Sequence, residues 1–145
     1  MRSAFLALGV IALWASTGCG SGSRVPWAQD INTAKAIATD RNTIVMAVFT
    51  DSSKEICVTF EEKTLSDPDV LERIKEYVPV RLQYGDPSSD ALGARLQVPA
   101  VPAVVFIRPN ADIVHRCVGA MKVAEFMKQL DKVEAELKES LVPLK

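Results

Sequence analysis

An unbroken run of six apolar residues, Ile44 to Phe49 (IVMAVF), constrains the fold of this chain more than any other feature. A strand with one solvated face alternates apolar and polar residues, so a continuous apolar run predicts a strand that is covered on both faces. Strands of this kind belong to sheets that carry helices on each side. We therefore expect an α/β domain with residues 44–49 as its central strand.

Helical and strand patterns alternate on either side of this run. We expect helices at 30–40, 55–65, 68–77, 90–96 and 123–140, and strands at 44–49, 78–84, 104–107 and 113–118, with a further strand near 25–27. A turn at 109–112 joins the last two strands as a hairpin. This order predicts a mixed central sheet with helices on both faces, which ends in a C-terminal β-hairpin and a helix.

Composition excludes several classes of protein. The 145 residues include 17 Lys and Arg against 18 Asp and Glu, and 48% of them are hydrophobic, which excludes a disordered chain. The chain has no basic block, so we expect no nucleic acid partner. Three cysteines are too few for a disulfide scaffold. The sequence has no phosphate-binding loop and no zinc-type ligand motif, and we therefore expect no cofactor and no metal.

The first residues are typical of an export signal. Arg2 precedes an apolar run at 4–14, which is too short to span a bilayer as a helix. Ser16-Thr17-Gly18-Cys19 is similar to a bacterial lipobox, which implies cleavage before Cys19 and a lipid on that cysteine. Ser16 stands where Leu is usual, so secretion without a lipid stays an alternative. A short buried N-terminal helix is the other alternative.

The chain is accordingly divided into three parts. We expect a signal peptide at 1–18, a flexible tether rich in Gly and Ser at 19–25, and a folded domain at 26–142. The predicted location is the bacterial cell envelope or periplasm, with the domain anchored to a membrane through the lipid on Cys19.

Three segments carry a resemblance to a known family. Residues 60–70 (FEEKTLSDPDV) resemble the segment after the active site in the thioredoxin-like domain of transmembrane thiol:disulfide interchange reductases. Residues 96–103 (LQVPAVPA) resemble the segment that carries the cis-proline of that family, which falls on Pro102. Val118-Gly119 is similar to the end of its last strand. The resemblance covers 27–130 and implies a thioredoxin fold.

The active site is where the sequence departs from this family. The Cys-x-x-Cys motif falls on Lys54-Glu55-Ile56-Cys57, so Lys54 stands at the nucleophile and Cys57 at the second cysteine. Ser53 stands where Trp is usual, and Val48 stands at the buried acid of many members. Dithiol exchange needs one thiol that attacks and a second that resolves the mixed disulfide. Because an amine cannot form a disulfide, the resemblance implies a degenerate site without dithiol turnover.

The other cysteines leave several interpretations open. Cys57 is either a monothiol that forms mixed disulfides, with Lys54 favouring its thiolate, or an inert buried thiol. His115 and Cys117 share one face of a predicted strand. A Cys57–Cys117 disulfide is a hypothesis, and a metal site made by these cysteines and His115 is a weaker one. The simpler interpretation of His115 is a half-exposed strand residue.

Pro102 supports a function that needs no thiol. A cis X-Pro bond exposes the backbone of the preceding residue, Val101, and the family uses that edge to hold an extended peptide. The alternative is a purely structural turn. We therefore predict a binding module for a protein or peptide partner in the envelope. The alternatives are a monothiol disulfide oxidoreductase or reductase that acts through Cys57, and a structural or assembly protein.

Overall fold

The computed structural model describes residues 24–140. Its elements are α1 (Ile31–Asp40), β1 (Val45–Thr50), α2 (Glu55–Thr59), the π-helix η1 (Phe60–Leu65), α3 (Pro68–Ile74), β2 (Val78–Gln83), α4 (Pro87–Arg95), β3 (Ala103–Ile107), β4 (Ile113–Val118) and α5 (Val123–Glu139). β1 pairs parallel with β2 and antiparallel with β3, and β3 pairs antiparallel with β4. The sheet order is β2-β1-β3-β4, so the predicted mixed sheet and hairpin are confirmed.

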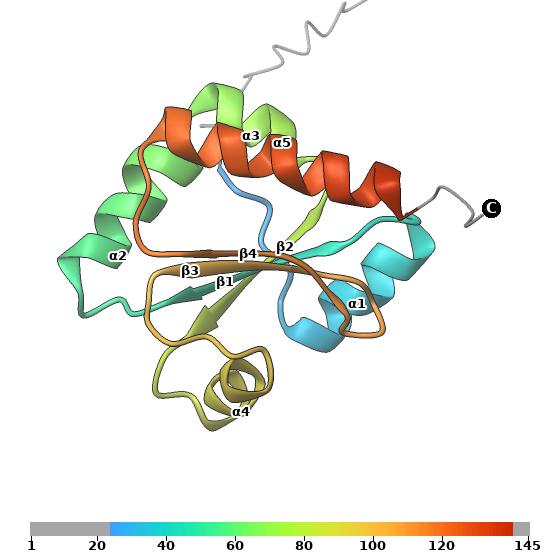
Figure 1. The fold of residues 1–145 in the computed structure, drawn as a ribbon. Coiled ribbons are helices and arrows are strands. Elements are labelled where there is room, and N and C mark those ends of the chain that lie inside the picture. Colours follow the sequence, from blue (N-terminus) through green and yellow to red (C-terminus); the bar gives the residue numbers. More distant parts are fainter. Residues whose placement is uncertain (1–23, 141–145) are drawn as a thin grey trace, which may run out of the picture.

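β1 is buried on both faces, as its composition predicts. Met46 and Val48 point to the face covered by η1, α3 and α5, whereas Val45, Ala47 and Phe49 point to the face covered by α1 and α4. Figure 1 shows α3 and α5 on one side of the sheet and α1 and α4 on the other. The period of two along a strand thus divides one apolar run between two cores.

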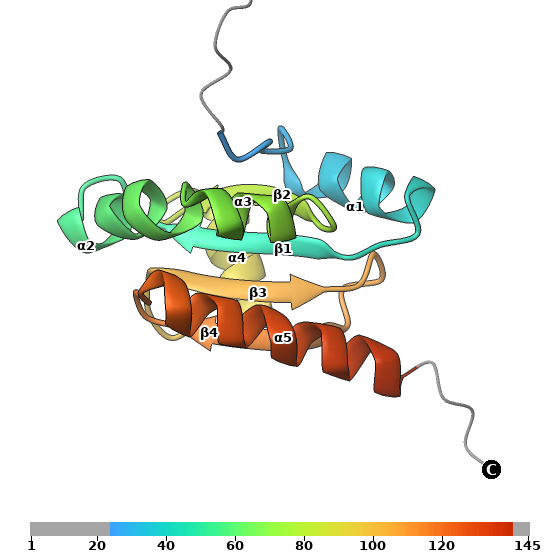
Figure 2. The same ribbon diagram turned by 90° about the horizontal axis from the view of Figure 1, so that it is seen from above.

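Aromatic rings hold the core under α5 together. The rings of Phe60 and Phe126 meet edge to face, with centroids 5.8 Å apart and planes at 85°. Phe60 begins η1 and Phe126 lies on the buried stripe of α5, together with Leu130 and Val133. Figure 2 shows α5 running along the sheet beside β3 and β4. This ring pair therefore joins the helical segment after β1 to the last helix.

Tyr77 makes the stability of this fold sensitive to alkaline pH. Burial, reinforced by the charge of Glu134, raises the pKa of Tyr77 from 10.0 to about 12. Between these values the unfolded chain loses the phenolic proton while the folded chain keeps it, so the free energy of unfolding falls as pH rises. We expect Tyr77→Phe to abolish this part of the loss in unfolding free energy, which amounts to about 3 kcal/mol between pH 10 and pH 12. Urea unfolding of both proteins at pH 8 and above pH 10 measures the difference, and identical losses in both would contradict it.

The structure corrects the predicted position of α4. The loop expected at 85–89 contains the start of this helix, which runs from Pro87 to Arg95. The Asp86 carboxylate caps the helix by accepting a hydrogen bond from the Ser89 N–H group, and Pro87 takes the first helical position. α3 begins in the same way, with Asp67 as the cap before Pro68. The signal for α4 was therefore present in the sequence.

Three other expectations need correction. The helix expected at 55–65 divides into α2 and the π-helix η1, and the helix expected at 68–77 ends at Ile74.

The strand expected near 25–27 is reduced to one parallel bridge between Ala28 and Val80, made by a hydrogen bond from the Ala28 N–H group to the Pro79 carbonyl. A single bridge leaves the segment before α1 beside β2 without extending the sheet.

The signal peptide, its cleavage site, Cys19 and most of the tether lie outside the described residues, and so does the end of the predicted domain at 142. Within 24–140, no helix combines the length and the apolar character needed to cross a bilayer.

Candidate functional site

The predicted site residues that the structure describes gather at one end of the sheet. Strand register places Phe49 of β1 opposite Ala103, the first residue of β3, and Ala103 opposite Val118, the last residue of β4. Thr50 at the end of β1 lies opposite Gln83 at the end of β2. The segments that follow β1 and β2 and the segment that precedes β3 therefore meet at this end.

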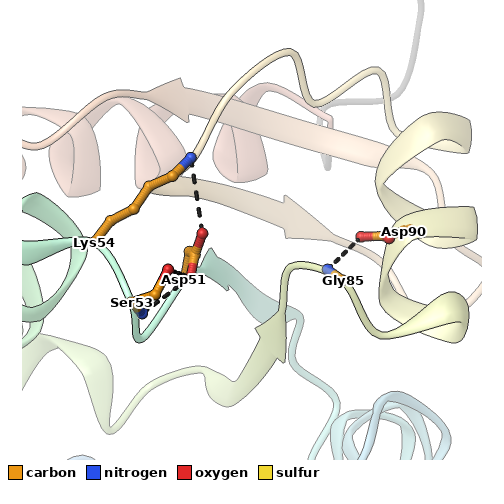
Figure 3. A network of polar contacts seen from close by, with 5 residues as sticks. All are labelled: Asp51, Ser53, Lys54, Gly85 and Asp90. Carbon is orange, nitrogen blue, oxygen red and sulfur yellow. Dashed lines mark hydrogen bonds and ion pairs between the residues drawn. The ribbon is translucent and has the colours of Figure 1, made fainter.

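Asp51 organises the turn between β1 and α2. Its Oδ1 atom accepts hydrogen bonds from the Ser53 hydroxyl at 2.6 Å and from the Ser53 backbone N–H group at 3.0 Å. Its carbonyl accepts a third from the Lys54 N–H group at 3.0 Å. The bonds from Ser53, with a smaller contribution from the Lys54 charge, lower the pKa of the Asp51 carboxyl. Figure 3 shows this network.

Lys54 places a positive charge where the family resemblance puts a nucleophilic thiol. It is the N-cap residue of α2, and its side chain makes no capping hydrogen bond. Its Nζ atom lies 3.8 Å from the Asp51 carboxylate and 5.5 Å from the centroid of the Tyr84 ring. A cation at a helix N-terminus is unfavourable, and both contacts offset that effect. The Lys54 side chain is still 51% exposed.

Cys57 is three residues further on and points inward. It is the third residue of α2, its exposed fraction is 0%, and its N–H group donates to the Lys54 carbonyl at 3.0 Å. The N-cap and the third helical position lie close together in a first turn, as capping geometry requires. The spacing of a Cys-x-x-Cys motif is therefore kept in the backbone, with an exposed amine and a buried thiol.

Cys117 lies in the core under α5. It is 4% exposed, and burial raises the pKa of its thiol from 9.0 to about 11. Both Cys57 and Cys117 are free thiols, so the predicted disulfide between them is not formed in the structure. Cys117 packs in the core with residues of α3, η1 and α5, and Cys57 lies at the start of α2.

His115 is tied to α5. Its Nδ1 atom lies 2.9 Å from the Glu136 carboxylate and its Nε2 atom 2.9 Å from the Gln129 side-chain oxygen. Both ring nitrogens are therefore occupied. Within residues 24–140 there is no group of three or more His, Cys, Asp or Glu side chains placed so that they could hold a metal ion. His115 is the half-buried strand residue of the simpler interpretation.

A groove of about 480 Å³ lies beside Lys54. One wall is formed by Lys54 and Tyr84, and the other by α4 with Asp90 and Ala94. Apolar residues line the rest, namely Phe49, Val98, Pro99, Ala100 and Val101. Gly93 allows α4 to approach the floor, because a Cβ atom there would lie 3.3 Å from the Phe49 ring. The groove therefore joins a charged rim to an apolar interior.

The segment before β3 offers backbone groups to this groove. The Val101–Pro102 peptide bond is cis, and the Pro102 carbonyl accepts a hydrogen bond from the Gly119 N–H group at 2.8 Å. Among the described residues, no hydrogen bond uses the backbone N–H or carbonyl groups of Ala100 or Val101. Unpaired backbone groups at an edge can pair with an extended chain.

Sequence reasoning missed three residues at this site. Asp51, Tyr84 and Asp90 line or organise the groove together with the predicted Lys54 and Val101. Only Asp51 gave a usable signal, because an Asp two residues before a Ser, directly after a strand, is a pattern for a side-chain-capped turn. Tyr84 and Asp90 come together with Lys54 only through the tertiary fold.

A second groove, of about 660 Å³, lies between the helical segment 55–64 and the start of α5. Its walls include Ile56, Phe60 and Met121, and none of the predicted site residues lines it. It is larger than the groove beside Lys54 but lacks unpaired backbone from the segment before β3.

Comparisons with known proteins cover most of the described chain. The model of a family described as a thioredoxin-like domain matches residues 30–134. A search of the curated proteins found no match.

Solved structures give further matches. The solution structure of a thioredoxin from Thermus thermophilus is 30% identical with a TM-score of 0.65, over 71% of this chain and 82% of that one. A DsbH oxidoreductase is 16% identical with a TM-score of 0.67, over 77% and 85%. The C-terminal domain of DsbD from Neisseria meningitidis, in its oxidised form, is 17% identical with a TM-score of 0.56, over 70% and 88%. The last two matches are evidence of a shared fold alone.

Proposed function

This chain belongs to the thioredoxin-like domain family, which is related to disulfide oxidoreductases, and from that premise we propose that it binds an extended peptide or protein segment without dithiol turnover. One observation carries the proposal. An exposed ammonium, Lys54, takes the helix position of an attacking thiol, beside a groove whose Val101 backbone groups are unpaired. Loss of the thiol removes the chemistry and leaves the binding edge intact.

The thiol content of the site argues against turnover. An attacking thiolate has to be exposed, and a second thiol has to resolve the mixed disulfide. The exposed position holds Lys54, and the thiol of Cys57 is fully buried. A dithiol cycle has no first step with these two side chains.

The surroundings of the groove suit a polypeptide ligand. Tyr84 is an exposed aromatic side chain, and it lines the groove beside the apolar Val98, Pro99 and Val101. Apolar side chains that are gathered in an open groove mark interaction sites. The free backbone edge would add main-chain hydrogen bonds, as in other modes of strand addition. The proposed partner is a protein of the cell envelope, and the lipid on Cys19 would keep the domain at a membrane.

A groove-filling variant tests this function. The probe is fluorescein-labelled insulin B chain whose cysteines are carboxymethylated, which is an extended polypeptide without reactive thiols. We expect the wild-type protein to bind it, and Ala94→Trp to weaken binding about tenfold or more, because the indole would occupy the exposed wall of the groove. Ala36→Trp, on the exposed side of α1, is the matched control. Anisotropy that shows no wild-type binding, or equal losses in both variants, would refute the proposal.

The competing function is monothiol exchange through Cys57. Reduction of insulin by dithiothreitol, with and without the protein, separates the two functions. We expect the protein to leave the dithiothreitol rate unchanged, because Cys57 is buried. A faster rate that Cys57→Ser abolishes would instead establish the monothiol function.

A further inference from the structure

We propose that Lys54 makes the groove selective for extended segments that carry an acidic side chain. The side chain at the family's nucleophile position would then recognise a negative charge on the ligand. This inference rests on the proposed peptide-binding function and adds the chemistry of the preferred ligand. It also gives position 54 a role in ligand specificity, in place of the role in thiol exchange that the family's cysteine has there.

The charge of Lys54 remains available to a ligand. Its only ionic contact in the described chain is with Asp51, at 3.8 Å, which is longer than a hydrogen bond. The Asp51 oxygen that faces Lys54 is Oδ2, whereas the two hydrogen bonds from Ser53 go to Oδ1, and the Lys54 side chain is 51% exposed. The ammonium therefore keeps its N–H donors for another acceptor, and a carboxylate is the acceptor that adds charge to the hydrogen bond.

Tyr84 fixes where that charge lies. The Lys54 ammonium stands 5.5 Å from the centre of the Tyr84 ring, and both side chains line the groove. A cation–π contact restrains a flexible side chain and leaves its outer hydrogens free. An acidic side chain entering the groove would consequently meet the ammonium at its rim, above the apolar floor.

Asp90 gives the α4 wall of the groove a negative charge, opposite in sign to that of the Lys54 wall. It lies on the α4 wall, and its Oδ1 atom accepts a hydrogen bond from the Gly85 N–H group at 3.0 Å (Figure 3). A carboxylate of the ligand would be repelled from this wall and attracted to the Lys54 wall. Successive side chains of an extended peptide point to opposite sides. The acidic residue would therefore be recognised at one position of the peptide and in one orientation.

A set of labelled peptides tests this proposal with the full chain. Each peptide has the same apolar and uncharged background, and one position carries Glu, Gln or Lys; the substituted position is moved along the series. Fluorescence anisotropy at low salt gives the affinities. We expect Glu to bind about threefold tighter than Gln at one position, and Lys to bind more weakly than Gln there. Salt should reduce the preference, since the ion pair lies at the exposed rim.

Two lysine variants identify the residue responsible. Lys54→Gln should bring the ratio of Glu to Gln affinities to about one. Lys128→Gln makes the same change in net charge on the exposed side of α5 and should keep the ratio. Equal affinities for Glu and Gln at every position, or a preference that survives Lys54→Gln, would overturn the proposal while peptide binding itself stands. Failure of every peptide to bind the wild-type protein would overturn both this inference and the proposed function.

Discussion

Lys54→Cys is expected to give this protein a disulfide-reductase activity that we do not expect of the wild type. We expect the variant to accelerate insulin reduction by dithiothreitol about tenfold or more over the uncatalysed rate. The expectation follows from the helix geometry, because position 54 is the exposed N-cap of α2 and Cys57 is the buried third residue of the same turn. Exposed and buried thiols with this spacing are what attack and resolution require.

The electrostatic environment at the start of α2 also favours the thiolate form of a cysteine at position 54. Removal of the Lys54 ammonium takes away a charge that the helix N-terminus disfavours, and a thiolate at the same place is stabilised by the helix dipole. The Asp51 carboxylate works in the opposite direction, since it lies next to the substituted side chain. The hydrogen bonds from Ser53 lower the pKa of Asp51 and keep it ionised, so its charge offsets part of the effect of the helix.

Two controls accompany this variant. Lys54→Ser removes the amine without adding a thiol, and the double variant Lys54→Cys, Cys57→Ser removes the resolving thiol. Neither should accelerate insulin reduction. A silent Lys54→Cys variant with native circular dichroism would show that spacing and exposure are insufficient, and that Ser53 or the apolar Val48 also prevents turnover.

Phe126→Ala is expected to cost about 3–5 kcal/mol of unfolding free energy, the largest stability loss among the changes considered. Phe126 is fully buried and meets the Phe60 ring edge to face. Truncation therefore removes buried apolar area, an aromatic contact and the filling of the core between η1 and α5. Protein domains typically have unfolding free energies of about 5–15 kcal/mol, so this loss would remove a large part of the stability of the fold.

Urea unfolding followed by circular dichroism measures this loss. Phe126→Leu keeps most of the volume and should cost less than about half as much, whereas Lys128→Ala on the exposed side of α5 should change stability by less than about 0.5 kcal/mol. A loss below about 1 kcal/mol for Phe126→Ala would mean that α5 contributes little to the core, contrary to its burial.

Local patterns were sufficient to predict most of the architecture. The apolar run at 44–49 predicted a strand covered on both faces, and the helical pattern at 123–140 predicted the last helix. The family match and the similar solved structures confirm the thioredoxin fold that the resemblance implied. These elements were accessible because each one is determined by its own periodicity and burial.

The parts that sequence reasoning missed depend on contacts between distant segments. The π-helix η1 interrupts a segment whose composition is ordinary for an α-helix, and Glu61 within it contacts Thr50 of β1 and Arg81 of β2. Tyr84 reaches Lys54 only because β1 and β2 end side by side. No periodicity within one segment reports such pairs. The start of α4 is a different case, since Asp86 and Pro87 carried a readable signal.

The turn at Asp51 has a consequence for how the binding face responds to its surroundings. In a dithiol protein, oxidation and reduction make and break a covalent link within the first turn after the central strand. Here Lys54 and Cys57 cannot form that link, and the turn that precedes α2 is held by hydrogen bonds from Ser53 and Lys54 to Asp51, which undergo no oxidation or reduction. The groove should therefore keep one shape across the whole range of ambient redox potential. Its occupancy would then report the concentration of its ligand and not the oxidation state of the compartment.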